Sequence, residues 1–401
     1  MTVVANELLA RLTEIRATDP GAVQKALARR RRRPLLLNSP LAAARAGNSP
    51  PPLAGEGQAG SSPPPLAGEG QAGTSPPPPA GEGQGGGSLF LVAADHPARG
   101  VLKVGTDPMA MADRGELLHR LLTALERPGV DGILGTADIV DDLALLGALD
   151  GKVVFGSMNR GGLTGYRFEL DDRFTAYTAA GIADSGLDGG KMMVRVADEP
   201  EALRTLAACA HAIDELSARK LPAMIEVFAS HVEDGRVHNR ADADSLIRAI
   251  TIVSGLGTTS AYVWLKLPVV EDLERVMRAT SLPTLLLGGD PGEDPAETFA
   301  SWKRAMTIPQ VRGLVAGRTL LYPRDGDVAR AVDQAAAIVA EKNKPKSPSP
   351  SGGGQDGGPQ SPSPSGGGRG GGPQFPAPSG GGQGGGPQSP SPARGGGQGG
   401  G

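Results

Sequence analysis

Cysteine is nearly absent from this chain, which has Cys209 alone among its 401 residues. A single cysteine excludes an intrachain disulfide framework and any zinc site built on cysteine ligands. This usage is typical of a reducing compartment, and we expect a cytoplasmic protein.

Long apolar runs and an excess of charge are missing as well. No stretch approaches the ~18–20 consecutive apolar residues that a membrane span needs, and the amino terminus lacks the apolar core of a secretory signal. The formal net charge is −3, and 21% of the residues are charged. This balance indicates neither a nucleic acid nor a membrane as a partner.

The histidines are few and do not follow the spacing of metal ligands. Neither an HxH nor an HExxH pattern occurs among the chain's five histidines, which are His96, His119, His211, His231 and His238. Since metal-dependent sites commonly use such spacings, we expect no metal centre.

Glycine and proline, by contrast, are abundant, with 61 and 36 residues that crowd into two segments. Residues 38–88 repeat a 13-residue unit of the SPPPLAGEGQAGS type, and residues 343–401 repeat a 14-residue unit of the SPSPSGGG type. Neither unit carries the hydrophobic face that a stacked repeat requires. We expect a disordered insert and a disordered tail.

Residues 1–37 predict a helical segment before the insert. Apolar residues at helical spacing within residues 3–16 indicate one helix, and Asp19-Pro20 opens a second. That second helix ends in five arginines, residues 29–33. They would either bind phosphate or, as we favour, offset the helix macrodipole while remaining in solvent.

Residues 89–342 have ordinary globular composition and a length that suits one (β/α)8 barrel of ~250 residues. Eight short apolar segments alternate with segments of helical periodicity. These strand candidates are residues 89–95, 132–138, 152–158, 191–196, 223–228, 261–267, 284–289 and 313–318. Alternation without hairpin signals implies a parallel sheet, and eight units favour an α/β fold closed as a TIM barrel over an open doubly wound sheet.

Two lysines lie within predicted interior strands, Lys191 in GGKMMVR and Lys266 in YVWLKLP. A buried ammonium must be paired or must give up its proton, and such an amine is the nucleophile that forms Schiff bases with carbonyl substrates. Strand alternation directs both lysines, together with Glu226 and Arg195, into the barrel interior.

A carboxylate between two amines outlines a mechanism. One amine would attack a ketone, the second would keep the first partly deprotonated, and Glu226 would move protons. The alternative is a buried salt bridge without chemistry. We favour catalysis because buried ion pairs seldom repay their desolvation.

Polar residues also end the first, seventh and eighth strands. Asp95 closes the first strand before His96, where it would act as an acid or base, bind substrate hydroxyls, or only cap the turn. The seventh strand ends in Gly288-Gly289 and the eighth in Gly317-Arg318. Backbone N–H groups and a guanidinium at these two ends can hold a phosphate.

The segments AADHPARG, KMMVRV, IEVF, WLKLP and GLVAGR, in this order, resemble the class I Schiff-base aldolases of the tagatose-bisphosphate and deoxyribose-phosphate aldolase-like (β/α)8 group. The resemblance spans about residues 89–341 and is closest to an actinobacterial barrel family associated with inositol catabolism. It implies that Lys266 forms the imine. It further implies catalytic roles for Lys191, Glu226 and Asp95 and a phosphate-binding role for Arg318. His96 and Arg195 depart from the pattern of those relatives, and we expect both among the substrate-binding residues.

The resemblance implies a lyase that cleaves or forms a C–C bond in a phosphorylated sugar or sugar acid. Deoxyribose phosphate and a deoxy-keto-gluconate phosphate are examples of such substrates. The covalent lysine imine would need no cofactor, and a homo-oligomer is left open. Two other functions stay open: a catalytically inert barrel that binds or regulates, and a sugar-phosphate isomerase. The isomerase would use the carboxylate without needing two interior amines.

Overall fold

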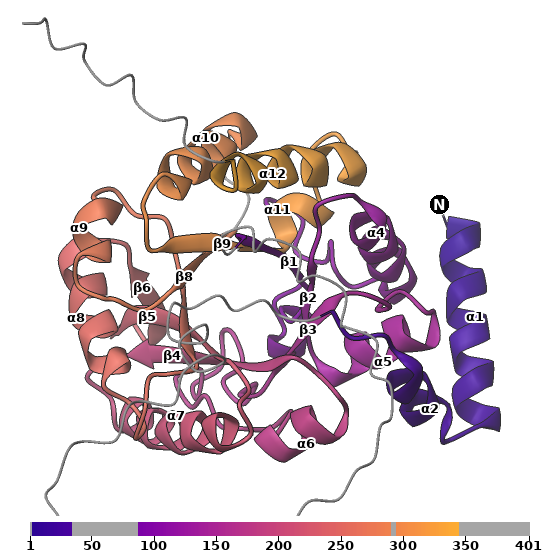
Figure 1. The fold of residues 1–401 in the computed structure, drawn as a ribbon, viewed down its shortest axis with the longest axis horizontal. Helices are drawn as coiled ribbons and strands as arrows, with labels where there is room; N and C mark the ends of the chain where they lie inside the picture. The colour runs from indigo at the N-terminus through magenta and orange to yellow at the C-terminus, as the bar shows by residue number, and fades with distance from the viewer. Residues whose placement is uncertain (1, 34–86, 290–293, 345–401) are drawn as a thin grey trace, which may run out of the picture. The chain divides into compact units, whose positions relative to one another are not determined.

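The computed structural model describes residues 2–33, 87–289 and 294–344 (Figure 1). The repeats of the predicted insert and tail lie outside these ranges. Within the ranges, no helix is both long enough and apolar enough to cross a membrane.

Eight parallel strands form the centre of the molecule. They are β1 (Leu89–Ala93), β2 (Gly132–Gly135), β3 (Val153–Ser157), β4 (Gly189–Val196), β5 (Ala223–Glu233), β7 (Val263–Leu267), β8 (Thr284–Leu287) and β9 (Val311–Ala316). Neighbouring strands follow the order β4-β3-β2-β1-β9-β8-β7-β5, and β4 also pairs with β5. That last pairing closes the sheet, so the predicted (β/α)8 barrel is confirmed.

Helices surround this ring of strands (Figure 1). They are the 3-10 helix η1 (Pro97–Arg99), α4 (Arg114–Glu126), α5 (Ala137–Leu145), α6 (Ala179–Asp184), α7 (Pro200–Ala218), α8 (Ala243–Ser254), α9 (Leu273–Met277), α10 (Pro295–Met306), α11 (Arg318–Leu321) and α12 (Val328–Lys342). Helix α4 shows why they form. Its N-cap Asp113 accepts the backbone N–H of Glu116, and Leu117, Leu118 and Leu121 bury one face.

Strand side chains alternate between two environments. Those facing out pack under the helices, and a smaller apolar cluster fills the barrel, with Leu91, Phe155, Met224, Leu285 and Val315 among its members. This alternation sets the site, because it turns every second residue of β4, β5 and β7 inward.

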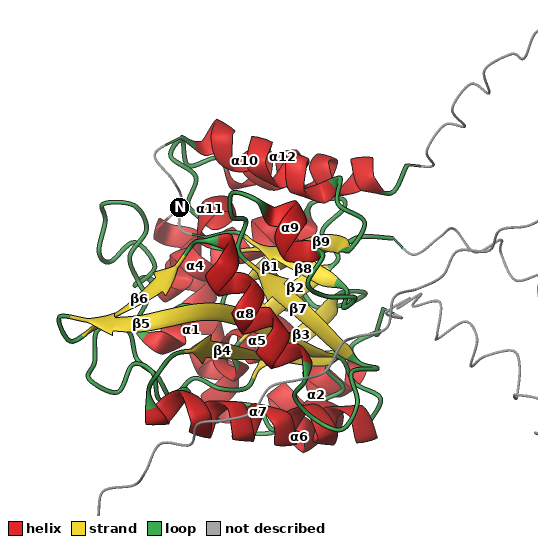
Figure 2. Cartoon of the chain, turned by 90° about the vertical axis from the view of Figure 1, so that its left-hand side faces the viewer, coloured by secondary structure: helices red, strands yellow, loops and turns green. Residues whose placement is uncertain are grey.

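A hairpin extends the fifth strand, although the sequence was expected to lack one. Strand β5 continues to Glu233 and pairs with the antiparallel β6 (Arg236–Arg240), and together they project from one end of the barrel (Figure 2). Asp234 and Gly235 have φ angles of 50° and 71°. An Asp-Gly pair suits this two-residue turn because both positions need a positive φ. The dipeptide is the sequence signal for the hairpin.

The amino-terminal helices pack beside the barrel as α1 (Thr2–Thr18) and α2 (Ala22–Arg29) (Figure 1). Helix α1 approaches α4 closely at Gly115, where an added Cβ would lie 2.7 Å from the carbonyl oxygen of Ala5. A glycine is therefore required at this contact.

Of the five arginines at the end of α2, Arg30 alone leaves the solvent, and the side chains of Arg31, Arg32 and Arg33 are at least half exposed, as expected. The Arg30 side chain is 3% exposed and lies 3.1 Å from the carboxylate of Asp188. Arg33 pairs with Asp131 at 2.6 Å. These two aspartates precede β4 and β2, and they accept the backbone N–H groups of Val154 and Phe90, the first at 2.9 Å and the second at 2.7 Å. The arginines thus fasten the amino-terminal segment to carboxylates at the start of the strands.

Candidate active site

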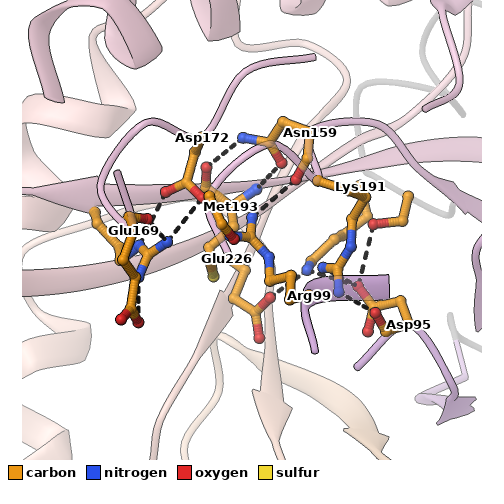
Figure 3. Close-up of polar contacts among 12 residues, drawn as sticks. Asp95, Arg99, Asn159, Glu169, Asp172, Lys191, Met193 and Glu226 are labelled. Carbon is orange, nitrogen blue, oxygen red and sulfur yellow. Dashed lines mark hydrogen bonds and ion pairs between the residues drawn. The ribbon is translucent and has the colours of Figure 1, made fainter. Parts of the chain in front are cut away.

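A chain of four charged side chains lies inside the barrel near the carboxyl ends of the strands. Lys266 Nζ donates to Glu226 Oε1 at 2.5 Å, and Lys191 pairs with the other oxygen of the same carboxylate. Lys191 Nζ also donates to Asp95 Oδ2 at 2.9 Å (Figure 3). All four residues are buried. The structure therefore connects Lys191, Glu226 and Lys266, from three predicted interior strands, with Asp95 at the end of the first barrel strand.

Register explains why these side chains meet. Glu226 on β5 lies level with Lys266 on β7, and Lys191 on β4 lies level with Met224, one inward position before Glu226. Because inward positions recur every second residue, Lys191 and Lys266 flank Glu226 from its two neighbouring strands.

The charges in this chain alter one another's pKa values. Burial alone would raise the pKa of Glu226, but the positive charges of Lys191 and Lys266 outweigh it and hold this pKa at about 2. Burial lowers the pKa of Lys191, although Asp95 and Glu226 oppose the shift. Glu226 is therefore a carboxylate at neutral pH, beside an amine that loses its proton more readily than an ordinary lysine.

Asp95 is held by residues that the sequence reasoning missed. Ser157 Oγ donates to Asp95 Oδ2 at 3.1 Å, and Arg160 Nη1 lies 3.1 Å from the same oxygen. Burial would raise the pKa of Asp95, but Lys191 and Arg160 hold it well below its usual range. Ser157 and Arg160 lie at and after the end of the third strand, where the rule applied to the other strands would have found them.

His96 is a half-buried, neutral imidazole at the end of the first strand. Burial lowers its pKa to about 3, against the attraction of Asp95. Among the described residues, its Nδ1 has no hydrogen-bond partner. An added Cβ at Gly317 would lie 3.0 Å from His96 Cε1, so the glycine lets this ring approach the end of β9.

One cavity of about 370 Å³ collects the whole predicted site. All ten candidate residues line it: Asp95, His96, Lys191, Arg195, Glu226, Lys266, Gly288, Gly289, Gly317 and Arg318. The order of strands places β8 and β9 across the barrel from β3 and β4. Gly288, Gly289 and Arg318 therefore face the end of β4 across the cavity.

The β4 side of the cavity is built around Asp172, which is fully buried. Arg195 Nε donates to Asp172 Oδ2 at 2.9 Å, and its Nη1 donates to Glu169 Oε1 at 3.0 Å. Arg99 also pairs with Asp172 and donates to the carbonyl oxygens of Gly162 and Asn159, at 2.7 and 2.8 Å (Figure 3). Although burial lowers the pKa of Arg195, the two carboxylates outweigh it and raise this pKa.

Asn159 fixes the strand that carries Lys191. Its side chain donates to the Met193 carbonyl oxygen at 2.6 Å and accepts the Met193 N–H at 2.7 Å, extending the β3–β4 pairing beyond the ladder.

Within the described ranges, no group of three or more histidine, cysteine, aspartate or glutamate side chains could hold a metal ion.

Comparison with known proteins places the chain in a family. The model of the Cgl0159-like family matches residues 87–336. The crystal structure of Cgl0159 from Corynebacterium glutamicum (Brevibacterium flavum) is 46% identical, with a TM-score of 0.70, over 84% of this chain and 97% of that chain. An archaeal fructose 1,6-bisphosphate aldolase is 16% identical, with a TM-score of 0.50, over 64% of this chain and 94% of that chain, which is a likeness of fold alone. No curated protein matches the sequence. The chain belongs to the Cgl0159-like family.

Proposed function

We propose that the protein is a class I aldolase that cleaves or forms a C–C bond in a phosphorylated sugar through an imine on Lys266. The observation that carries this proposal is one carboxylate, Glu226, in contact with two lysine amino groups beside a cavity. We further propose that this aldolase belongs to the tagatose-bisphosphate and deoxyribose-phosphate aldolase-like group. A role in inositol catabolism is one function that this membership would allow.

Lys266 is the proposed nucleophile. It passes a proton to Glu226, 2.5 Å away, and its amine then adds to the substrate ketone. Glu226 returns a proton to the hydroxyl of the carbinolamine, which leaves as water and gives the iminium. The C–C bond then breaks as a base removes the proton of the hydroxyl two carbons away, and the bonding electrons move into the iminium to form an enamine.

Asp95 is the proposed base for that hydroxyl. It is ionised, and it lies on the cavity beside Lys191, with which it pairs at 2.9 Å. Lys191 contacts both carboxylates, so it keeps them charged and can exchange protons between them. Neither role needs a metal or another cofactor, because the iminium itself accepts the electrons.

The phosphate of the substrate would lie at the ends of β8 and β9. Gly289 has a φ of 68°, a conformation suited to glycine, and an added Cβ at Gly317 would lie 2.3 Å from the carbonyl oxygen of Ala93. No atom lies within 4 Å of an added Cβ at Gly289, so a ligand can approach the backbone there, whereas Gly317 allows close packing against β1; Arg318 lines the same part of the cavity.

Trapping the imine tests this proposal. Sodium borohydride, added with a series of ketose phosphates and aldose phosphates, should inactivate the protein irreversibly and add the mass of the reduced ligand. Retro-aldol products should form with the same ligands. An inert barrel gives neither result. A sugar-phosphate isomerase interconverts the ligand without leaving an adduct, and either pattern would contradict the proposal.

A further inference from the structure

The two sides of the cavity differ in charge. On the side of β8 and β9, the described lining residues include Gly288, Gly289 and Arg318 but no acidic side chain. On the side of β3 and β4, Glu169 lines the cavity, and Asp95, which follows β1 beside β9, directs its carboxylate toward this side, where it contacts Ser157 and Lys191. A ligand that spans the site therefore meets a cation at one end and carboxylates at the other.

Arginines also lie on the carboxylate side, but each is engaged with an acid. Arg160 pairs with Asp95 at 3.1 Å and donates to its carbonyl oxygen. Arg195 uses its Nε and both Nη atoms on Asp172 and Glu169. Arg99 shares Asp172. These three guanidinium groups already have the partners that a second anionic group of a ligand would need.

Releasing one of them would be costly. If Arg195 turned to a ligand, the fully buried Asp172 would lose one of its two cationic partners, and breaking a buried ion pair by removing one partner is strongly destabilising. The ligand's anion would also stand beside Glu169, and like charges at close range are repelled. Hydroxyl groups meet no such penalty, because a carboxylate accepts their hydrogen bonds.

The charge of the whole site agrees with this division. The described lining residues together with Asp172 comprise six lysine or arginine side chains and four acidic ones, a surplus of two positive charges. One phosphate group, with a charge of about −1.5 to −2 at neutral pH, balances that surplus.

Resting on the proposed function, we infer that the substrate carries a single anionic group. That group is a phosphate at the Arg318 side, and a neutral polyol occupies the side of Asp95 and Glu169. Deoxyribose-phosphate-like monophosphates fit this division. Sugar bisphosphates and phosphorylated sugar acids do not, because both place a second anion near the carboxylates.

Three ligands without a carbonyl test the inference in the wild-type protein. Glucitol 6-phosphate, glucitol 1,6-bisphosphate and 6-phosphogluconate share six carbons and one phosphate, and the last two add an anion at carbon 1. Titration calorimetry should show that glucitol 6-phosphate binds at least about tenfold more tightly than the other two, because of the like-charge repulsion. Equal or tighter binding of the two-anion ligands, or no binding of glucitol 6-phosphate, overturns the inference.

A variant pair sharpens the test. Glu169→Gln removes a negative charge beside Arg195, so the gap between glucitol 6-phosphate and 6-phosphogluconate should shrink several-fold. Asp171→Asn is the matched control, since Asp171 belongs to the same loop but bonds the exposed Arg173 at 3.0 Å. Its gap should equal that of the wild type. An unchanged gap in Glu169→Gln, or an equal change in both variants, contradicts the inference.

These measurements separate the inference from the proposed function. The three ligands cannot form an imine, so their relative affinities report only on charge in the cavity. Absence of borohydride trapping with every ketose phosphate and aldose phosphate would remove the aldolase proposal while the order of affinities stands. Trapping together with preferred binding of bisphosphates would keep the aldolase and remove the single-anion substrate.

Discussion

Buried carboxylates meet cations at both ends of this barrel, yet the two ends do different work. At the amino ends of the strands, Asp188 is paired with Arg30 and Arg32 and accepts a backbone N–H. At the carboxyl ends, Glu226 is paired with Lys191 and Lys266. Arginine stays protonated under all ordinary conditions, whereas a buried lysine can give up its proton.

The comparison shows how the same ion pairing serves structure in one place and chemistry in another. The arginine partners of Asp188 never change charge. Their role is to hold the amino-terminal segment on the barrel, and this role does not require access to a ligand. Glu226 instead borders a cavity of about 370 Å³ and bonds two groups able to exchange protons with it. Charge pairing alone therefore does not distinguish a catalytic cluster. The kind of cation and access to a ligand do.

The largest expected effect is on turnover, when the chemistry is removed from the carboxyl-end cluster. Glu226→Gln keeps the shape of the side chain but cannot accept a proton, so the rate should fall by roughly 10²–10⁴-fold. Glu233→Gln, an exposed glutamate at the tip of β5, serves as the control and should keep full activity. A normal rate for Glu226→Gln at every pH would reduce this residue to an ion-pair partner.

Removing the corresponding charge at the other end should change stability instead. Asp188→Asn leaves the buried Arg30 without its charged partner, and the free energy of unfolding should fall by about 3–5 kcal/mol in urea titrations. Turnover per folded molecule should be unchanged. Asp150→Asn breaks an exposed pair with Arg31 and should cost at most about 1 kcal/mol. Similar losses in both variants would show that the amino-end pairs are no more than surface contacts.

Arg318 is expected to act on binding of the phosphate alone. A hydrogen bond to a charged group contributes about 1.5–3 kcal/mol, so Arg318→Ala should weaken a phosphorylated ligand by roughly 10–100-fold. The dephosphorylated ligand should bind as it does to the wild type, as measured by calorimetry. An equal loss for both ligands would place Arg318 outside the phosphate site.

A smaller effect concerns the pH dependence of stability. The pKa of His96 is about 3 in the folded protein and 6.5 when exposed. Between these two pH values the unfolded chain therefore binds a proton at this residue that the folded chain does not bind. Stability is then complete above pH 6.5 and is lost as the pH falls from 6.5 toward 3, by up to about 1.4 kcal/mol per unit. His96→Asn should show a shallower loss between pH 6.5 and 4.5. Parallel stability curves for the two proteins would refute the account of this histidine.

The sequence predicts the barrel and the inward-facing residues well, because both follow from strand alternation. An apolar run with one charge in it, such as YVWLKLP, indicates that the strand is buried, and its alternation indicates that the charged side chain points inward. The candidate residues come together because the carboxyl ends of parallel strands share one edge.

Contacts that loops form only in the folded protein could not be predicted from strand alternation. Arg99 and Arg195 meet Asp172 only because the loop after β3 folds back over the site, and no local pattern encodes that path. The ion pairs of Arg30 and Arg33 were not predicted for the same reason. Their partners, Asp131 and Asp188, lie about 100 to 160 residues away along the chain. The Asp-Gly hairpin, by contrast, had a local signal that was not used.

The position of the covalent adduct tests the central claim most directly. Wild-type protein would be reduced with borohydride in the presence of a turned-over ketose phosphate, digested, and sequenced by mass spectrometry, alongside Lys191→Met and Lys266→Met. The account predicts the reduced adduct on Lys266 in the wild type, slower trapping at the same residue in Lys191→Met, and none in Lys266→Met. An adduct on Lys191, or activity that survives in Lys266→Met, would contradict it.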